Sequence, residues 1–317
     1  AAADLLEAVF QVMRMRLLRW FESRLDPYPE AAPAQPPASL YAFCRHYTRG
    51  AEPWLLLMAA TTAAIALAEV ALYAYVGSLV DRMNALGVAG FLAGEGRRLG
   101  WMALLVLLGL PALVLLNSLV QHQTLLGNFP MRIRWNVHRY LLRQSMGYFQ
   151  DEFAGRIATK LMQTSLAVRE TVVKLFDIGN YILVYFGATL VVAASADWRL
   201  MLPFAGWLLG YGLLMRWFVP RMGKVSQLQA DARSTMTGRI VDSYTNIATV
   251  KLFSHSRREQ AYAHEAMDGF LATVYRQMRL ATTVNAALYT LNMALVFAVA
   301  ALGIWLWLHG HASVGAV

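Results

Sequence analysis

Five long apolar stretches dominate the hydropathy pattern of the chain. They cover residues 53–80, 99–127, 172–194, 198–219 and 281–308, and polar or basic sequence flanks each of them. As a helix, each stretch is long enough to cross about 30 Å of hydrocarbon, with some tilt for the longer ones. The pattern therefore predicts five membrane-spanning helices in an all-α membrane protein.

The connections between these stretches differ greatly in length. Residues 87–98 read as a polar loop, and residues 195–197 as a tight turn. Residues 128–171 and 221–280 instead show helical periodicity, and both are far longer than the roughly two to eight residues that join compact helices. Their charged and turn residues could not be satisfied in hydrocarbon. We therefore expect two helical extensions that project from the bilayer.

The first 52 residues carry a different pattern. Apolar positions at three-to-four spacing, with arginines off that face, predict an amphipathic interfacial helix over residues 1–26. Five prolines follow in residues 27–39, which we interpret as a semi-rigid extended spacer. Leu40, Phe43 and Tyr47 then predict a second interfacial helix at the start of the transmembrane domain, residues 40–317.

Composition and charge agree with a membrane protein. Hydrophobic residues make up 58% and charged residues 15% of the 317 residues, and the mean hydropathy is +0.42. Residues 1–52, 128–171 and 221–280 hold 22 of the 28 Lys and Arg residues, which places these segments on the cytoplasmic side of an inner membrane. The basic residues are spread over membrane-flanking helices, so no nucleic-acid partner is expected. The single cysteine, Cys44, cannot form an internal disulfide.

The sequence contains no phosphate-binding loop. Gly223 and Lys224 lack both the upstream glycine and the following hydroxyl residue of that motif. We also find no spacing typical of a zinc protease or a nucleophile elbow. No catalytic, cofactor-binding or metal-binding residue is therefore predicted in this chain, and a transport activity would need energy from elsewhere.

Several polar residues fall inside the predicted spans and are candidates for a substrate pathway. Glu69 lies in the middle of the first span, where a carboxylate costs roughly 2.5–3.5 kcal/mol to insert. It is either a protonated or hydrogen-bonded structural residue, or a contact for cargo or protons. The same two interpretations apply to Asn117 and Gln121 on the second span, and to the polar stripe on the fifth span formed by Asn285, Tyr289 and Asn292.

Two short segments carry a family resemblance. In the first, Phe149 is followed by polar or small residues, then by Gly155, Ile157, Lys160 and Leu161. In the second, Asp242 precedes the pattern Ile247-x-x-Val250-x-x-Phe253. These segments resemble the two cytoplasmic coupling loops of ATP-binding-cassette (ABC) exporters with the type IV transmembrane fold. The chain departs from the family at Thr164-Ser165, where Asn-Asp is common.

The resemblance implies contacts with a nucleotide-binding domain. The coupling residues it assigns are Gln150, Asp151, Glu152, Phe153, Ala154, Gly155, Thr249, Val250, Lys251, Leu252, Phe253 and Ser254. It further implies a sixth span and a C-terminally fused domain that binds ATP and Mg²⁺, both absent from this sequence. A homodimer or a pair of related half-transporters within membrane lipids is the expected assembly.

The sequence thus favours the permease domain of an ATP-driven exporter, which moves a hydrophobic or amphipathic substrate out of the cytoplasm by alternating access. A proton-coupled secondary transporter, in which Glu69 titrates, is the first alternative. A non-transporting regulatory membrane subunit is the second.

Overall fold

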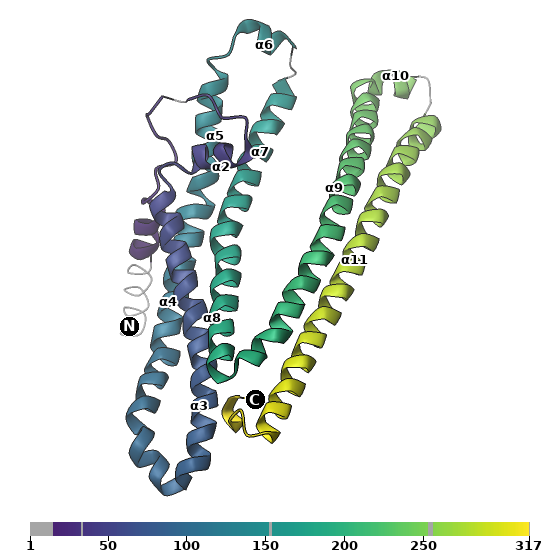
Figure 1. The fold of residues 1–317 in the computed structure, drawn as a ribbon. Helices are drawn as coiled ribbons and strands as arrows, with labels where there is room; N and C mark the ends of the chain where they lie inside the picture. Colours follow the sequence, from purple (N-terminus) through teal and green to yellow (C-terminus); the bar gives the residue numbers. More distant parts are fainter. Residues whose placement is uncertain (1–14, 33, 152–153, 253–255, 317) are drawn as a thin grey trace, which may run out of the picture. The chain divides into compact units, whose positions relative to one another are not determined.

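A computed structural model describes residues 15–32, 34–151, 154–252 and 256–316. The chain forms two compact units that divide after Val192. Helices of several kinds account for all the regular elements within these ranges, which contain no strand (Figure 1). This agrees with the expected all-α class.

The first unit contains a short helix before the first span, three candidate spans and the first extension. Its helices and π-helical segments (η1–η3) are α2 (Leu40–Thr48), α3 (Glu52–Leu104), η1 (Leu105–Gly109), α4 (Leu110–Ser118), η2 (Leu119–Leu126), α5 (Asn128–Leu141), α6 (Met146–Asp151), α7 (Ala154–Lys174), η3 (Leu175–Gly179) and α8 (Asn180–Ala196), the last of which crosses the boundary between the units. Pro111 sits in the first turn of α4, directly after η1. A π turn at this point fits a proline that cannot donate a backbone hydrogen bond.

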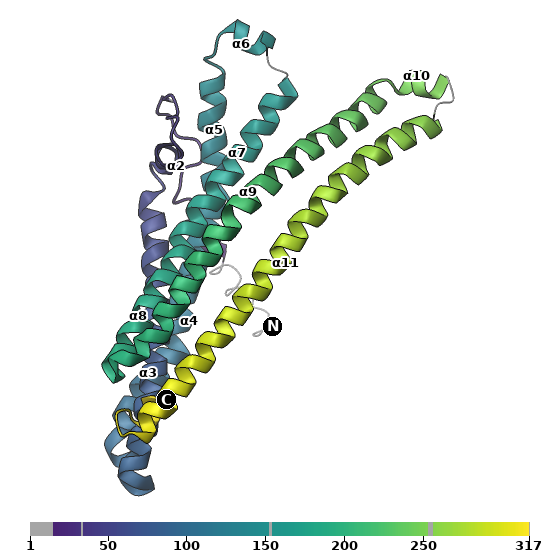
Figure 2. The ribbon, with the colours of Figure 1, turned by 45° about the vertical axis from the view of Figure 1, so that its right-hand side comes forward.

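The second unit is a long helical pair. A short 3₁₀ turn, η4 (Trp198–Leu200), leads into α9 (Met201–Thr245), and α10 (Ile247–Leu252) connects α9 to α11 (Ser256–Leu308) before a final 3₁₀ turn, η5 (Val314–Ala316). Helices α9 and α11 run side by side (Figure 2). Pro220 lies inside α9, which continues through it without a break.

Within the part of the chain that the structure describes, five helices are long and apolar enough to cross a membrane, as predicted. They cover Glu52–Met83, Glu95–Leu141, Ile157–Ala196, Trp198–Thr245 and Arg257–Leu308. The chain is therefore a multi-pass membrane protein.

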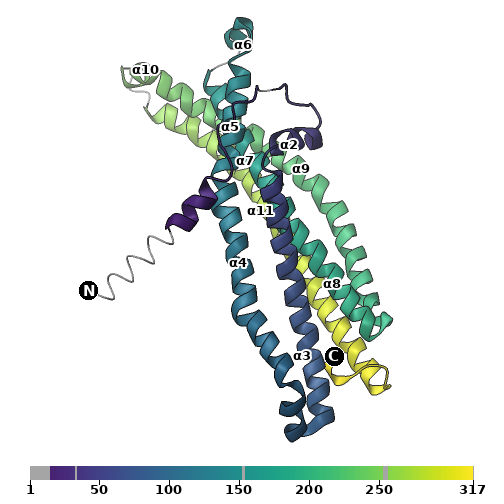
Figure 3. The same cartoon turned by 90° about the vertical axis from the view of Figure 1, so that its left-hand side faces the viewer.

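The loop predicted at residues 87–98 is wrong, because its backbone is helical within α3. Arg82 nevertheless pairs with Glu95, thirteen residues later. A straight helix would separate these residues by roughly 20 Å along its axis. The helical path must therefore turn back between them, where α3 approaches α4 (Figure 3). Ala, Leu, Glu and Arg favour the helical backbone here, against the glycines that suggested a loop.

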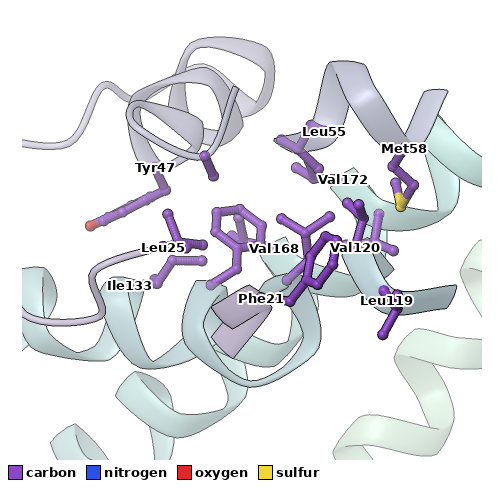
Figure 4. Packing of buried hydrophobic residues seen from close by; sticks show 14 residues of the cluster. Phe21, Leu25, Tyr47, Leu55, Met58, Leu119, Val120, Ile133, Val168 and Val172 are labelled. Atoms are coloured by element: carbon purple, nitrogen blue, oxygen red, sulfur yellow. The ribbon is translucent and has the colours of Figure 1, made fainter. Parts of the chain in front are cut away.

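The core of the first unit lies where the N-terminal segment meets the beginning of α3 (Figure 4). Phe129 and Ile133 from α5 are fully buried, next to Val168 and Val172 from α7. Phe21, Leu25, Tyr47, Leu55, Met58, Leu119 and Val120 complete most of this cluster. Most other apolar side chains of the spans are exposed, as expected for surfaces that lipid covers.

The N-terminal segment is attached along one face of α5. Side chains at 128, 132, 135 and 139 lie on that face and donate to backbone carbonyls about 106 residues earlier. The bonds run from Asn128 to Glu22 (2.7 Å), Arg132 to Asp26 (2.8 Å), Trp135 to Pro29 (3.3 Å), and Arg139 to Pro29 (2.6 Å) and Glu30 (3.0 Å). Residues 27–30 of the predicted spacer are thus fixed to α5, because proline lacks an N–H but keeps its carbonyl acceptor.

The same region contains the helix α2, at the place where a second interfacial helix was predicted. The Ser39 hydroxyl caps its first turn by accepting from the Ala42 N–H at 3.3 Å. Gly50 ends it with φ +87°, and a Cβ placed there would lie 2.5 Å from Nη2 of Arg132. Burial, with a smaller effect of Tyr140, raises the pKa of Tyr47 to about 12. Burial and then the charge of Arg49 lower the pKa of His46.

Candidate functional site: an intramembrane polar network and two helical tips

A polar network joins the first three spans inside the membrane segment of the first unit. Its centre is Asp177, whose Oδ1 accepts from the Thr62 hydroxyl at 3.0 Å and whose Oδ2 accepts from the Gln121 amide at 3.3 Å. The Thr61 hydroxyl lies 2.9 Å from the side-chain oxygen of Asn117. The same Asn117 oxygen accepts from the Thr62 hydroxyl at 3.4 Å, so the structure brings the predicted Asn117 and Gln121 into one network.

Irregular helix turns position this network. Asp177 lies in η3 and Gln121 in η2, both π-helical segments. A π turn inserts one residue into the helix and changes the direction of the side chains that follow, and such turns are frequent at functional sites. One residue after η3, Asn180 donates its side-chain amide to the Ala59 carbonyl at 2.7 Å.

Glu69 bonds to the third span. The Tyr181 hydroxyl donates to its Oε2 at 2.6 Å, and the Tyr181 ring stacks on Tyr185 with centroids 5.5 Å apart. Within the described part of the chain, neither Glu69 nor Asp177 forms an ion pair with Lys or Arg. Two intramembrane carboxylates are thus held by neutral donors, which offset part of the cost of placing them there.

The predicted stripe on the fifth span belongs to the second unit. Asn292 accepts from the Trp207 indole N–H at 2.9 Å, which links α11 to α9. Asn285 and Tyr289 are exposed, Tyr289 to 67%. The role of this stripe in a substrate pathway stays a prediction.

Two short helices end the extensions of the two units. Helix α6 follows α5, and α10 joins α9 to α11 (Figures 1 and 2). Gln150 and Asp151 lie in α6, Ala154 and Gly155 begin α7, and Thr249, Val250, Lys251 and Leu252 lie in α10. Apolar side chains are exposed on both tips: Phe149 to 39% and Leu252 to 81%. Glu152, Phe153, Phe253 and Ser254 lie outside the described residues.

Sequence reasoning missed Asp177, the residue that holds the network together. The signal was present, because Asp177 is a carboxylate five residues inside the predicted third span. Tyr181, Thr61 and Thr62 were missed as well. Threonine and tyrosine are common in apolar spans, so only their contacts across helices distinguish them.

Spanning helices that extend into long helical pairs, each ending in a short helix, define the membrane domain of a transporter class. The family model described as the ABC transporter transmembrane region matches residues 55–317, and the chain belongs to this family. It is also 44% identical over 302 residues to an uncharacterised ABC transporter ATP-binding protein of Haemophilus influenzae. That match covers 95% of this chain and 49% of the relative, so the chain spans about half the relative's length.

Proposed function

We propose that the chain is the permease domain of an ATP-driven exporter that moves a hydrophobic or amphipathic substrate out of the cytoplasm by alternating access. The observation that carries this proposal is the exposure of apolar side chains on α6 and α10, with Leu252 81% exposed. Apolar groups presented at the end of a long extension are typical of a surface that another domain covers. Membership of the ABC family supports a nucleotide-binding domain as that partner.

The nucleotide-binding domain would supply the ATP and Mg²⁺ chemistry. The relative is named an ATP-binding protein, and this chain matches only half of its length, which supports a fused domain. In this proposal two copies, or two related chains, assemble within membrane lipids. The N-terminus, α6 and α10 face the cytoplasm of an inner membrane, in keeping with the distribution of Lys and Arg.

ATP hydrolysis by the full-length protein in lipid nanodiscs tests this coupling. Leu252→Asp places a charge where an apolar contact is proposed, and such an unpaired buried charge costs several kcal/mol. We expect hydrolysis to fall more than tenfold with unchanged membrane insertion. Leu228→Asp is the matched control, because Leu228 is a 49% exposed leucine within α9 and away from α10. Equal hydrolysis in both variants would refute a coupling role for α10.

Labelling of single cysteines tests the orientation. Cysteines at Gln150 and Lys251, in a Cys44→Ser background, should react with an impermeant maleimide only after the membrane is permeabilised. Reaction from outside in intact cells would reverse the proposed topology.

A proton-coupled secondary transporter is the second candidate, favoured by the carboxylates Glu69 and Asp177 inside the membrane segment. Glu69→Gln keeps the acceptor for Tyr181 and removes the charge. An ATP-driven exporter should keep its ATP hydrolysis and its pH profile in this variant. The proton-coupled carrier would be favoured by two results together. The wild type would hydrolyse no ATP, and Glu69→Gln would abolish its pH-dependent transport.

A further inference from the structure

Four basic residues line one groove between α9 and α11. Arg221 and Lys224 come from α9, and Arg276 and Arg279 from α11. The groove has a volume of about 470 Å³, and Val225, Leu280 and Thr283 complete its lining. All four basic side chains are exposed. Two antiparallel helices therefore concentrate four positive charges at one place.

No carboxylate lines this groove. Asp231 is seven residues beyond Lys224 along α9, which is roughly 10 Å of helix rise. Asp268 is eight residues before Arg276 and lies 3.1 Å from His264. At such distances, about one Debye length, exposed charges are largely screened from one another. The four positive charges are thus not neutralised by nearby acidic residues.

Three other basic residues of the chain are engaged internally. Arg132 and Arg139 on α5 donate to backbone carbonyls, and Arg239 pairs with Glu265 at 3.1 Å. In the groove, Arg221 donates to the Trp217 carbonyl at 2.8 Å and lies over the Trp217 ring. Among the described residues, no hydrogen bond or ion pair is present for the side chains of Lys224, Arg276 and Arg279. Their donors are available for a ligand.

The position of the groove indicates the ligand. The apolar segments 198–219 and 281–308 end next to it, so it lies where these two spans leave the hydrocarbon. Phospholipid phosphates occupy this level. Arginine binds phosphate oxygens through paired N–H groups, while Val225 and Leu280 offer apolar contact in the same groove.

We propose that this groove binds the phosphodiester headgroup of an anionic phospholipid from the adjoining leaflet. Basic residues near membrane boundaries also set topology. For that role the side chains need not meet in one groove, and their N–H groups need not lack a partner. The site requires only that α9 and α11 span the membrane. It would therefore stand even if the direction of transport were different.

Lipid binding to the full-length purified protein tests the proposal. The protein in detergent micelles is titrated with phosphatidylglycerol or phosphatidylcholine, and bound lipid is measured by native mass spectrometry. Each Lys or Arg near an anionic headgroup contributes about fivefold in affinity. Arg276→Gln combined with Arg279→Gln should therefore weaken phosphatidylglycerol binding about 30-fold and leave phosphatidylcholine binding unchanged. Arg276→Lys combined with Arg279→Lys keeps the charge but loses the paired N–H groups, so it should restore only part of the affinity.

The matched control is Arg257→Gln combined with Arg258→Gln. It removes the same charge from the same helix, about 28 Å from Arg276 along the axis, and should change affinity less than twofold. If both double variants weakened phosphatidylglycerol binding equally, binding would depend on the overall positive charge of the helix, and the proposed site would be refuted. Equal affinity of the wild type for both lipids would also refute it. Displacement of phosphatidylglycerol by free glycerol phosphate below about 1 mM would assign the groove to a soluble phosphate and overturn the lipid as its ligand.

Discussion

Replacing Asp177 should loosen the packing of the first three spans. Asp177→Ala removes the acceptor of two hydrogen bonds, from Thr62 at 3.0 Å and from Gln121 at 3.3 Å. Hydrogen bonds between membrane helices contribute about 0.6 kcal/mol on average and up to about 1.7 kcal/mol. The two bonds together predict a loss of about 1–3 kcal/mol in the free energy of unfolding.

Asp177→Ala also removes the cost of inserting a carboxylate into the membrane, but this does not reverse the prediction. Unfolding in mixed micelles separates the helices but leaves them inserted, so that cost is shared by the folded and unfolded states and cancels to first order. Asp177→Asn keeps the acceptor for Thr62, and the Gln121 amide can rotate to present its oxygen. We therefore expect Asp177→Asn to lose less than about 0.6 kcal/mol.

Unfolding of the purified chain by sodium dodecyl sulfate, followed by circular dichroism, measures these differences. Thr290→Ala is the control, because among the described residues the Thr290 hydroxyl bonds only to the Ala286 carbonyl of its own helix. It should change stability by less than about 0.5 kcal/mol. If Asp177→Ala were as stable as Thr290→Ala, the network would not hold the spans together and the reasoning would be refuted.

Three further predictions concern the region around α2 and α5. Gly50→Ala should lower the melting temperature, since alanine is strained at φ +87° and its Cβ would lie 2.5 Å from Arg132, whereas Gly187→Ala, with open space around it, should not. Arg139→Ala should speed cleavage after Glu30 by a glutamyl endopeptidase about 5- to 30-fold, because Arg139 binds that carbonyl; Arg143→Ala should leave the cleavage rate unchanged. The pKa of Tyr47, raised to about 12 by burial, predicts that stability falls as pH rises from about 10 towards 12, since only the unfolded state then loses the proton. Tyr47→Phe should lack that loss in melting curves between pH 9 and 11.5, and identical curves would contradict the assigned pKa.

The spans and α2 could be predicted because their signals are local. A run of apolar residues fixes a span by length alone, and Leu40, Phe43 and Tyr47 mark one face of a single short helix. The same local reasoning failed at residues 87–98. There, glycines and arginines suggested a loop, whereas the backbone is helical and the chain still reverses direction, as the pair between Arg82 and Glu95 requires.

Contacts between distant segments left no such signal. The bonds from Arg132 and Arg139 join residues 106 to 110 positions apart, and no periodicity in residues 26–30 indicates their partner. The polar network was only partly predictable for the same reason. Glu69, Asn117 and Gln121 are visibly polar in apolar spans. The contacts of Gln121 with Asp177 and of Glu69 with Tyr181, however, depend on how the helices are rotated.

The central claim is that a nucleotide-binding domain covers the tip formed by α10. A photo-reactive phenylalanine analogue at Leu252 in the full-length protein, followed by mass spectrometry of the cross-linked peptides, tests it most directly. The same analogue at Val241, a 53% exposed residue on α9, is the control. The account predicts that Leu252 cross-links to peptides of the nucleotide-binding domain and that Val241 does so much less. Cross-links from Leu252 only to lipid, or to the domain no more than from Val241, would contradict it.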